Sequence, residues 1–257
     1  MPPPNTSPIL QQIGATVQTV HGSGGQPSQT LVDLLVGARN GYDWPSGTGT
    51  QLSQATILNL EASVAGHLAA LNINSAHSIV VDVSNWAGNN ANSHAAIIGA
   101  TAAERATMCT AIGNLCVPGN AVAGLGALCS LPGISLVIAS KIFRFCAPLR
   151  GAAVDRHASY FFNSLPVLNH GMTTNFVREW SNGRHTSSRL AIYSNRNYIR
   201  NRDEYVNNYL PLLANIANAM NALPALYTCA VTGNQTRWKP ADIEMAAYYW
   251  WACNGPR

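Results

Sequence analysis

Apolar residues recur along this chain mostly at the spacing of a helix face. Leu31, Leu34 and Leu35 keep that spacing in one segment, and Ile57, Leu60 and Val64 keep it in the next. Patterns of this kind predict helices over residues 29–39, 53–71, 95–111, 122–129, 136–145, 156–165, 202–222 and 240–253, with Ser53 as the cap of the second. The sequence therefore predicts an all-α, mainly helical protein.

Two segments do not follow that pattern. Residues 1–28 are rich in Pro, Ser, Gly, Gln and Thr, which predicts a flexible leader before a single folded domain over 29–257. The β-branched run 78–83 is short and leads into Ala-rich sequence, so it suits a buried strand and a helix equally. We find no convincing hairpin signal between strands.

Composition limits the class of protein. A hydrophobic fraction of 47% over 257 residues is enough for a large core, which excludes a disordered chain. We identify neither a secretory signal nor an apolar run long enough to cross a membrane, so we expect a cytoplasmic protein with six reduced cysteines and no metal site. If the protein is bacterial, we expect it to be associated with the nucleoid.

Positive charge is concentrated in the middle of the chain. Residues 141–202 contain ten basic and two acidic residues, whereas the rest of the chain contains five basic and nine acidic ones. The resulting net charges of +8 and −4 favour a polyanion-binding half joined to a mildly acidic half. The alternative is an ordinary solvated surface whose charge has no partner.

One stretch indicates chemistry. Residues 128–141 join two apolar helical segments through the turn Leu131-Pro132-Gly133, and a helix that starts after such a turn can hold a phosphate at its first amides. The segment Val154-Asp155-Arg156-His157 follows, with Asp155 located 24 residues after Leu131. Asp155 is suited either to catalysis or to capping the helix that we expect from residue 156.

Residues 127–162 resemble the helix-hairpin-helix DNA glycosylase superfamily. The resemblance rests on the Leu-Pro-Gly turn, on the 24-residue spacing from Leu131 to Asp155, and on the predicted helices around them. The resemblance implies a two-lobed fold with a cleft, a monomer that binds double-stranded DNA in the minor groove, and no cofactor beyond a monovalent cation at the hairpin. Asp155 would stabilise the oxocarbenium-like charge on the sugar and direct the attacking water. The implied DNA contacts are Gly133, Ser135, Arg144, Arg156 and His157, with Asn89 and Asn90 in the gap left by the flipped base and Trp86 and Trp250 in the base pocket.

The chain departs from the family pattern at several positions. Val137 stands where bifunctional members carry a nucleophilic Lys, and Lys141 follows one helical turn later. Ser135 replaces the second hairpin Gly, and only Cys229 and Cys253 lie where relatives bind an iron–sulfur cluster. These departures favour a hydrolytic, monofunctional enzyme of the cluster-free, 8-oxoguanine-glycosylase-like branch.

Three alternatives stay open: a glycosylase/lyase that uses Lys141, a non-catalytic hairpin protein that binds DNA, and a helical protein-interaction module. The sequence leaves the excised base open among oxidised purines, alkylated bases and hypermodified phage cytosines. It therefore leaves open both repair and defence against phage.

Overall fold

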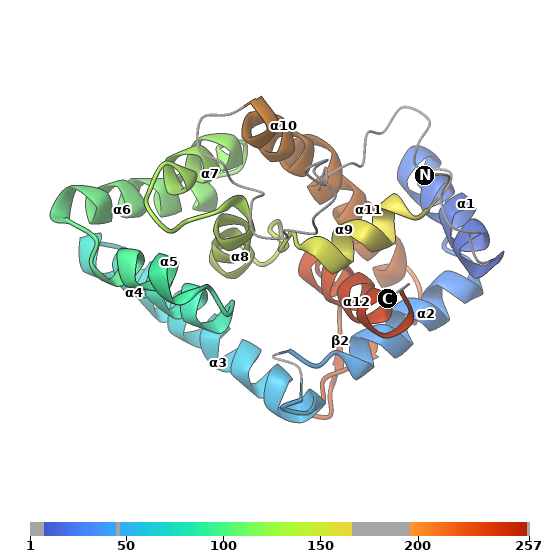
Figure 1. Ribbon diagram of the computed structural model, residues 1–257. Helices are drawn as coiled ribbons and strands as arrows, with labels where there is room; N and C mark the ends of the chain where they lie inside the picture. The colour runs from blue at the N-terminus through green and yellow to red at the C-terminus, as the bar shows by residue number, and fades with distance from the viewer. Residues whose placement is uncertain (1–7, 45–46, 166–195, 256–257) are drawn as a thin grey trace. The chain divides into compact units, whose positions relative to one another are not determined.

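The computed structural model describes residues 8–44, 47–165 and 196–255, and it is mainly helical, which confirms the all-α prediction (Figure 1). These residues form two compact units. Unit 1 comprises described residues of 8–54, 155–165 and 207–255, and unit 2 comprises residues 55–154 and 196–206. The helix α3 (Thr50–Ala69) and the π-helical turn η1 (Tyr205–Tyr209) each contribute residues to both.

Unit 1 is built around its last helix. The helix α12 (Pro240–Asn254) packs against α2 (Gln29–Gly41), α9 (Arg156–Asn163) and α11 (Leu210–Asn221), and α1 (Pro8–Ser23) packs on α11. A short antiparallel pair, β1 (Tyr227–Thr228) and β2 (Gln235–Thr236), precedes α12. We predicted no hairpin here, because two residues per strand are too few to show a period-two pattern.

Unit 2 consists of helices that pack pairwise. The helix α4 (Ile73–Trp86) packs against α5 (Ala91–Ile98), α6 (Ala102–Cys116) and α8 (Leu136–Cys146), while α7 (Ala121–Cys129) packs against α6, α8 and α10 (Arg196–Glu204). Close approach of α6 and α7 requires Gly124, where a Cβ atom would lie 2.8 Å from the Ala111 carbonyl oxygen. The ambiguous run 78–83 is therefore part of a helix, and its Ile79, Val80 and Val83 are fully buried.

The predicted flexible leader is wrong from residue 8 onward. Residues Leu10, Ile13, Val17 and Val20 of α1 are buried on one helix face. They are separated by Gln, Thr and Gly, so average composition hid a helical spacing that the individual positions contain. Residues 1–7 of the predicted leader lie outside the described residues.

Several predicted helix boundaries also need correction. The helix α3 begins at Thr50, and Ser53 is a buried residue inside it whose hydroxyl donates to Asp43 Oδ1 at 2.7 Å. This hydrogen bond lowers the pKa of the Asp43 carboxyl. The single helix predicted over 95–111 is two helices, because Thr101 and Glu104 form a capping box that starts α6. The helix predicted over 202–222 is interrupted by η1.

Candidate functional site

The predicted turn between two helices is present in unit 2. It follows α7, and Gly133 adopts φ +78°, a left-handed conformation that disfavours other residues. Ser135 then caps α8 by accepting a hydrogen bond from Ile138 N at 3.3 Å. Leu131 and Ile134 are buried, so apolar residues of the turn itself hold it against the core of unit 2.

The Asn-rich turn before α5 packs directly on this hairpin. Asn89 Nδ2 donates to the Gly133 carbonyl and to Ser84 Oγ, each at 3.2 Å. A Cβ atom at Gly133 would collide with the carbonyl oxygen of Ser93. Asn90 is exposed and caps α5 by accepting from Ser93 N at 3.0 Å. Two motifs that are 44 residues apart in sequence thus form one rigid surface, and Asn89 is half-buried within it.

The loop that leads from the hairpin to Asp155 folds back along α8. Gly151 lies so close to the helix that a Cβ atom would be 2.6 Å from the Phe143 carbonyl oxygen. Val154 N donates to Ser140 Oγ at 3.0 Å, and Tyr205 Oη donates to the Ala152 carbonyl at 2.6 Å. The residue immediately before Asp155 is therefore fixed to the second turn of the hairpin helix.

Asp155 itself is half-buried and begins α9 in unit 1. Its Oδ1 accepts a hydrogen bond from Ala158 N at 2.9 Å, so the capping role that the sequence suggested is present. Capping engages one carboxylate oxygen with the first turn of the helix and fixes the orientation of the group. The cap and a catalytic role are compatible, because a catalytic carboxylate also needs a fixed orientation.

The neighbours of Asp155 on α9 make aromatic contacts. The His157 ring meets the edge of the Tyr248 ring with 5.1 Å between their centroids. Trp250, predicted for a base pocket, packs on Phe161 at 5.4 Å and stays half-exposed. The side chain of Arg156 lies outside the described residues.

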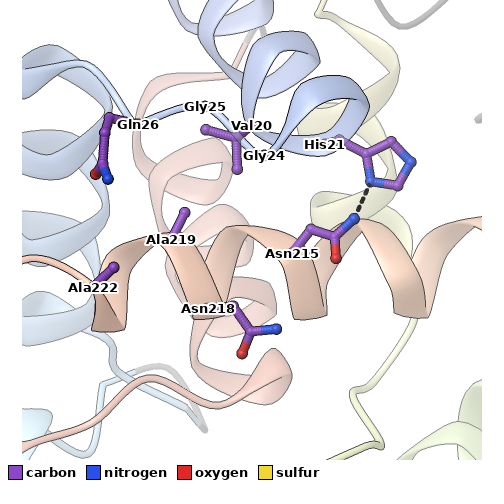
Figure 2. A pocket seen from close by; sticks show the side chains of 9 residues that line it. All are labelled: Val20, His21, Gly24, Gly25, Gln26, Asn215, Asn218, Ala219 and Ala222. Atoms are coloured by element: carbon purple, nitrogen blue, oxygen red, sulfur yellow. Dashed lines mark hydrogen bonds between the residues drawn. The ribbon is translucent and has the colours of Figure 1, made fainter.

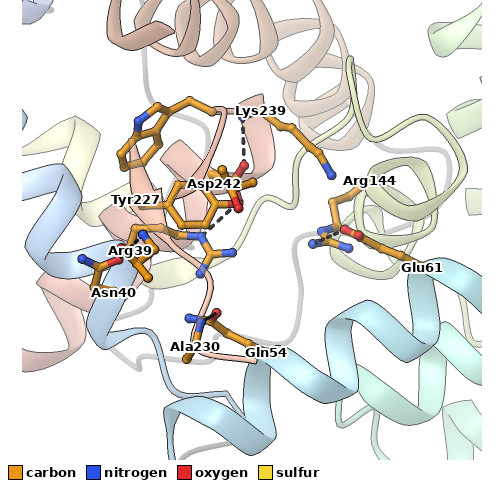
Figure 3. A network of polar contacts seen from close by, with 12 residues as sticks. Arg39, Asn40, Gln54, Glu61, Arg144, Tyr227, Ala230, Lys239 and Asp242 are labelled. Carbon is orange, nitrogen blue, oxygen red and sulfur yellow. Dashed lines mark hydrogen bonds and ion pairs between the residues drawn. The ribbon is translucent and has the colours of Figure 1, made fainter. Parts of the chain in front are cut away.

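Two predicted site residues on α8 are buried. Lys141 is buried with its Nζ atom 5.5 Å from the centroid of the half-buried Trp86 ring, which itself packs on Phe145. Arg144 is only 3% exposed and forms an ion pair with Glu61 at 3.0 Å (Figure 3). The prediction that Arg144 contacts DNA is therefore wrong, because a guanidinium held inside unit 2 by a carboxylate is not presented to phosphate.

The other described basic side chains of segment 141–202 are also engaged within the protein. Arg150 donates to the carbonyls of Leu115 and Cys116, and Arg202 pairs with Asp203 at 2.9 Å. All four described basic side chains of segment 141–202 (Lys141, Arg144, Arg150 and Arg202) are thus buried or engaged within unit 2. The other six lie outside the side chains that the structure describes. The net charge of +8 overstates the positive charge available to a polyanion.

The hairpin carbonyls do not fit the cation that the family resemblance implies. The Leu131 carbonyl accepts from Ile134 N at 3.3 Å, and the Gly133 carbonyl accepts from Asn89. Oxygens already engaged with donors are poor ligands for an ion, so we derive no role for one. Within the described ranges, no group of three or more His, Cys, Asp or Glu side chains is arranged to hold a metal.

A pocket of about 340 Å³ lies within unit 1, between α1, the loop after it and α11 (Figure 2). His21 Nδ1 and Asn215 Nδ2 are 3.1 Å apart on its wall, and Gln26 and Asn218 add two further amides. Burial lowers the pKa of His21, and none of the lining residues is Asp, Glu, Lys or Arg. The pocket is thus uncharged near neutral pH, and it contains none of the predicted site residues.

Comparison with protein-family models, with curated proteins and with solved structures found no match for this chain. None of the helices in the described part of the chain combines the length and apolar character needed to span a bilayer.

Proposed function

We propose that this protein is a monofunctional DNA glycosylase that hydrolyses the N-glycosidic bond of a flipped base in duplex DNA, with Asp155 as its catalytic carboxylate. The observation that carries the proposal is the hydrogen bond from Val154 N to Ser140 Oγ. It fixes Val154, the residue before Asp155, to the hairpin helix within unit 2.

The hairpin supports contact with DNA through its backbone. The first amides of a helix have no partner within that helix, and Ser135 satisfies only the amide of Ile138. The remaining amides and the helix dipole favour a phosphate oxygen at this end without any base readout. Asn90, exposed at the Asn-rich turn that packs on the hairpin, is suited to enter the space vacated by a flipped base.

The reaction needs a fixed negative charge beside the sugar. As the glycosidic bond breaks, positive charge develops on the deoxyribose, and an ionised carboxylate stabilises it while orienting water for attack. Val137 at the position of the family's nucleophilic Lys, together with the buried Lys141, favours water as the nucleophile.

The test uses a panel of duplexes that each carry one modified base, with mass spectrometry of the released base. Asp155→Asn keeps the acceptor oxygen that caps α9, so it separates chemistry from folding. We expect base release to fall by about 100-fold or more with an unchanged melting temperature. Asp33→Asn, at an exposed position on α2, is the matched control and should release base at the wild-type rate.

Three outcomes would contradict the proposal. Base release that survives Asp155→Asn removes Asp155 from the mechanism. Salt-dependent DNA binding without release of any base in the panel favours a non-catalytic hairpin protein. Borohydride should trap no covalent DNA adduct, and an adduct that disappears in Lys141→Ala would establish the lyase instead.

A further inference from the structure

The short hairpin of unit 1 holds a cysteine in a defined setting that the proposed function does not use. Cys229 is buried directly after β1. Its backbone N–H donates to the Asn234 carbonyl at 2.9 Å, and its carbonyl accepts from Gly233 N at 2.8 Å. These two bonds close the loop 229–234 and hold the backbone at Cys229 in place.

The loop directs donors at the sulfur. Burial by itself raises the pKa of the Cys229 thiol, but hydrogen bonds from the Thr232 hydroxyl and from the backbone amides of Thr232 and Val231, with the positive charge of Arg39, lower it overall. Successive backbone amides that converge on one point form an anion-binding nest. Here the anion that they suit is the thiolate.

A second observation at the same place points to an absent acceptor. Gln54 is 3% exposed, and its Oε1 accepts from Ala230 N, the amide of the Cys229–Ala230 peptide, at 2.7 Å (Figure 3). Its Nε2, on the same amide group, has no hydrogen-bond partner among the described residues. Arg39, also buried, binds Asp242 through Nε and likewise leaves Nη1 without a partner among them. Buried donors without acceptors are costly, so they indicate a group that arrives later.

We propose that Cys229 is a peroxide-sensitive thiol, with Gln54 and Arg39 as the donors that receive the oxygen of its oxidised form. The thiolate sulfur attacks one oxygen of a hydroperoxide, the O–O bond breaks, and the electron pair leaves with the other oxygen. With hydrogen peroxide the products are the sulfenic acid and hydroxide, and the hydroxide takes up the proton that the thiol released on ionising, which gives water. The sulfur is oxidised by two electrons, the peroxide is reduced by two, and the new oxygen supplies an acceptor for buried donors.

The other cysteines serve as internal controls for the test. Cys116 and Cys253 are exposed, and partial burial raises the pKa of the Cys116 thiol. The reduced full-length protein is treated with hydrogen peroxide and dimedone at neutral pH, and the adduct at each cysteine is followed by mass spectrometry. We expect Cys229 to be labelled about ten times faster than Cys116 or more, because the thiolate is the reactive form.

Two variants on the same hairpin test the cause. Thr232→Val removes a donor to the sulfur at an exposed position and should slow the labelling of Cys229 severalfold. Thr228→Val, also exposed, leaves those donors in place and should label like the wild type. Gln54→Leu should leave the first labelling step intact and speed further oxidation to the sulfinic acid, because the sulfenic oxygen loses a donor.

The proposal is overturned if Cys116 or Cys253 is labelled as fast as Cys229, a comparison within the wild-type protein that requires no variant to fold. It is also overturned if Thr232→Val and Thr228→Val label alike. Neither of these outcomes bears on the proposed glycosylase activity, because the glycosylase assay measures the base released from DNA.

Discussion

Each compact unit buries an arginine in an ion pair, and the two pairs share a 3.0 Å N–O distance but differ in their access to water. In unit 1, the side chains of Arg39 and Asp242 are 6% and 4% exposed. In unit 2, the side chain of Arg144 is 4% exposed, whereas that of Glu61 is 22% exposed. The distances alone would assign the two pairs the same importance.

The surroundings of the two pairs separate them. Asp242 Oδ1 accepts from Arg39 Nε and from Tyr227 Oη, each at 3.0 Å, and its Oδ2 accepts from Lys239 N at 2.9 Å. The Tyr227 ring also lies 4.4 Å from the Arg39 guanidinium carbon. Burial opposes the charge on Arg39, but Asp242 in particular outweighs it and raises the arginine's pKa. Water therefore has little access to Arg39 if the Asp242 carboxylate is lost. The Glu61 carboxylate, by contrast, is already partly solvated.

The largest expected effect comes from removing the buried charge in unit 1. Asp242→Asn keeps the shape of the side chain but leaves the Arg39 guanidinium without its counter-charge in a site that excludes water. We expect the free energy of unfolding to fall by about 3 kcal/mol, measured by urea denaturation. Asp33→Asn, on the exposed face of α2, is the control and should change it by less than about 0.5 kcal/mol. A loss for Asp242→Asn as small as that of the control would mean that the network carries little stability.

The corresponding change in unit 2 should cost less. Glu61→Gln removes the carboxylate that pairs with Arg144, but the side chain at position 61 is partly exposed, so water near it can lessen the cost of the lost charge. We expect a loss of about 1 kcal/mol in the same measurement. If the loss equals that of Asp242→Asn, the exposure of the carboxylate does not determine the cost of breaking such a pair.

The sequence predicted the helices of this fold well where apolar spacing was regular. The helices α2, α7, α8, α9 and α12 begin within one residue of their predicted starts. The helix α1 was missed because residues 1–28 as a whole are rich in Pro, Ser, Gly, Gln and Thr, and the break before α6 was missed because Ala-rich sequence continues through it. In both places a local signal existed: the spacing of Leu10, Ile13 and Val17, and the pair Thr101 and Glu104 at capping-box distance.

For the candidate site, the sequence identified the hairpin and the helix start at Asp155 but not what connects them. Ser140 is a small polar residue on an apolar helix, and no periodicity marks it as the acceptor for Val154 N. Asn89 was predicted to contact DNA, yet its hydrogen bond to Gly133 joins two distant motifs, which only a folded chain reveals. Arg144 was misassigned because a charge count ignores the partner, Glu61, that lies 83 positions earlier.

The last expected effect, no larger than that of Glu61→Gln, distinguishes a network from a simple pair. Tyr227→Phe keeps the ring beside Arg39 but removes the hydroxyl that donates to Asp242, and we expect a loss of about 1 kcal/mol in the free energy of unfolding. In the Asp242→Asn background that hydroxyl no longer meets a charged acceptor, so the same substitution should cost clearly less. The difference between the two backgrounds is the coupling energy of the pair. Equal losses in both would show that the Tyr227 hydroxyl acts independently of the Asp242 charge, and the contrast between the two buried arginines would then rest on exposure of the carboxylate alone.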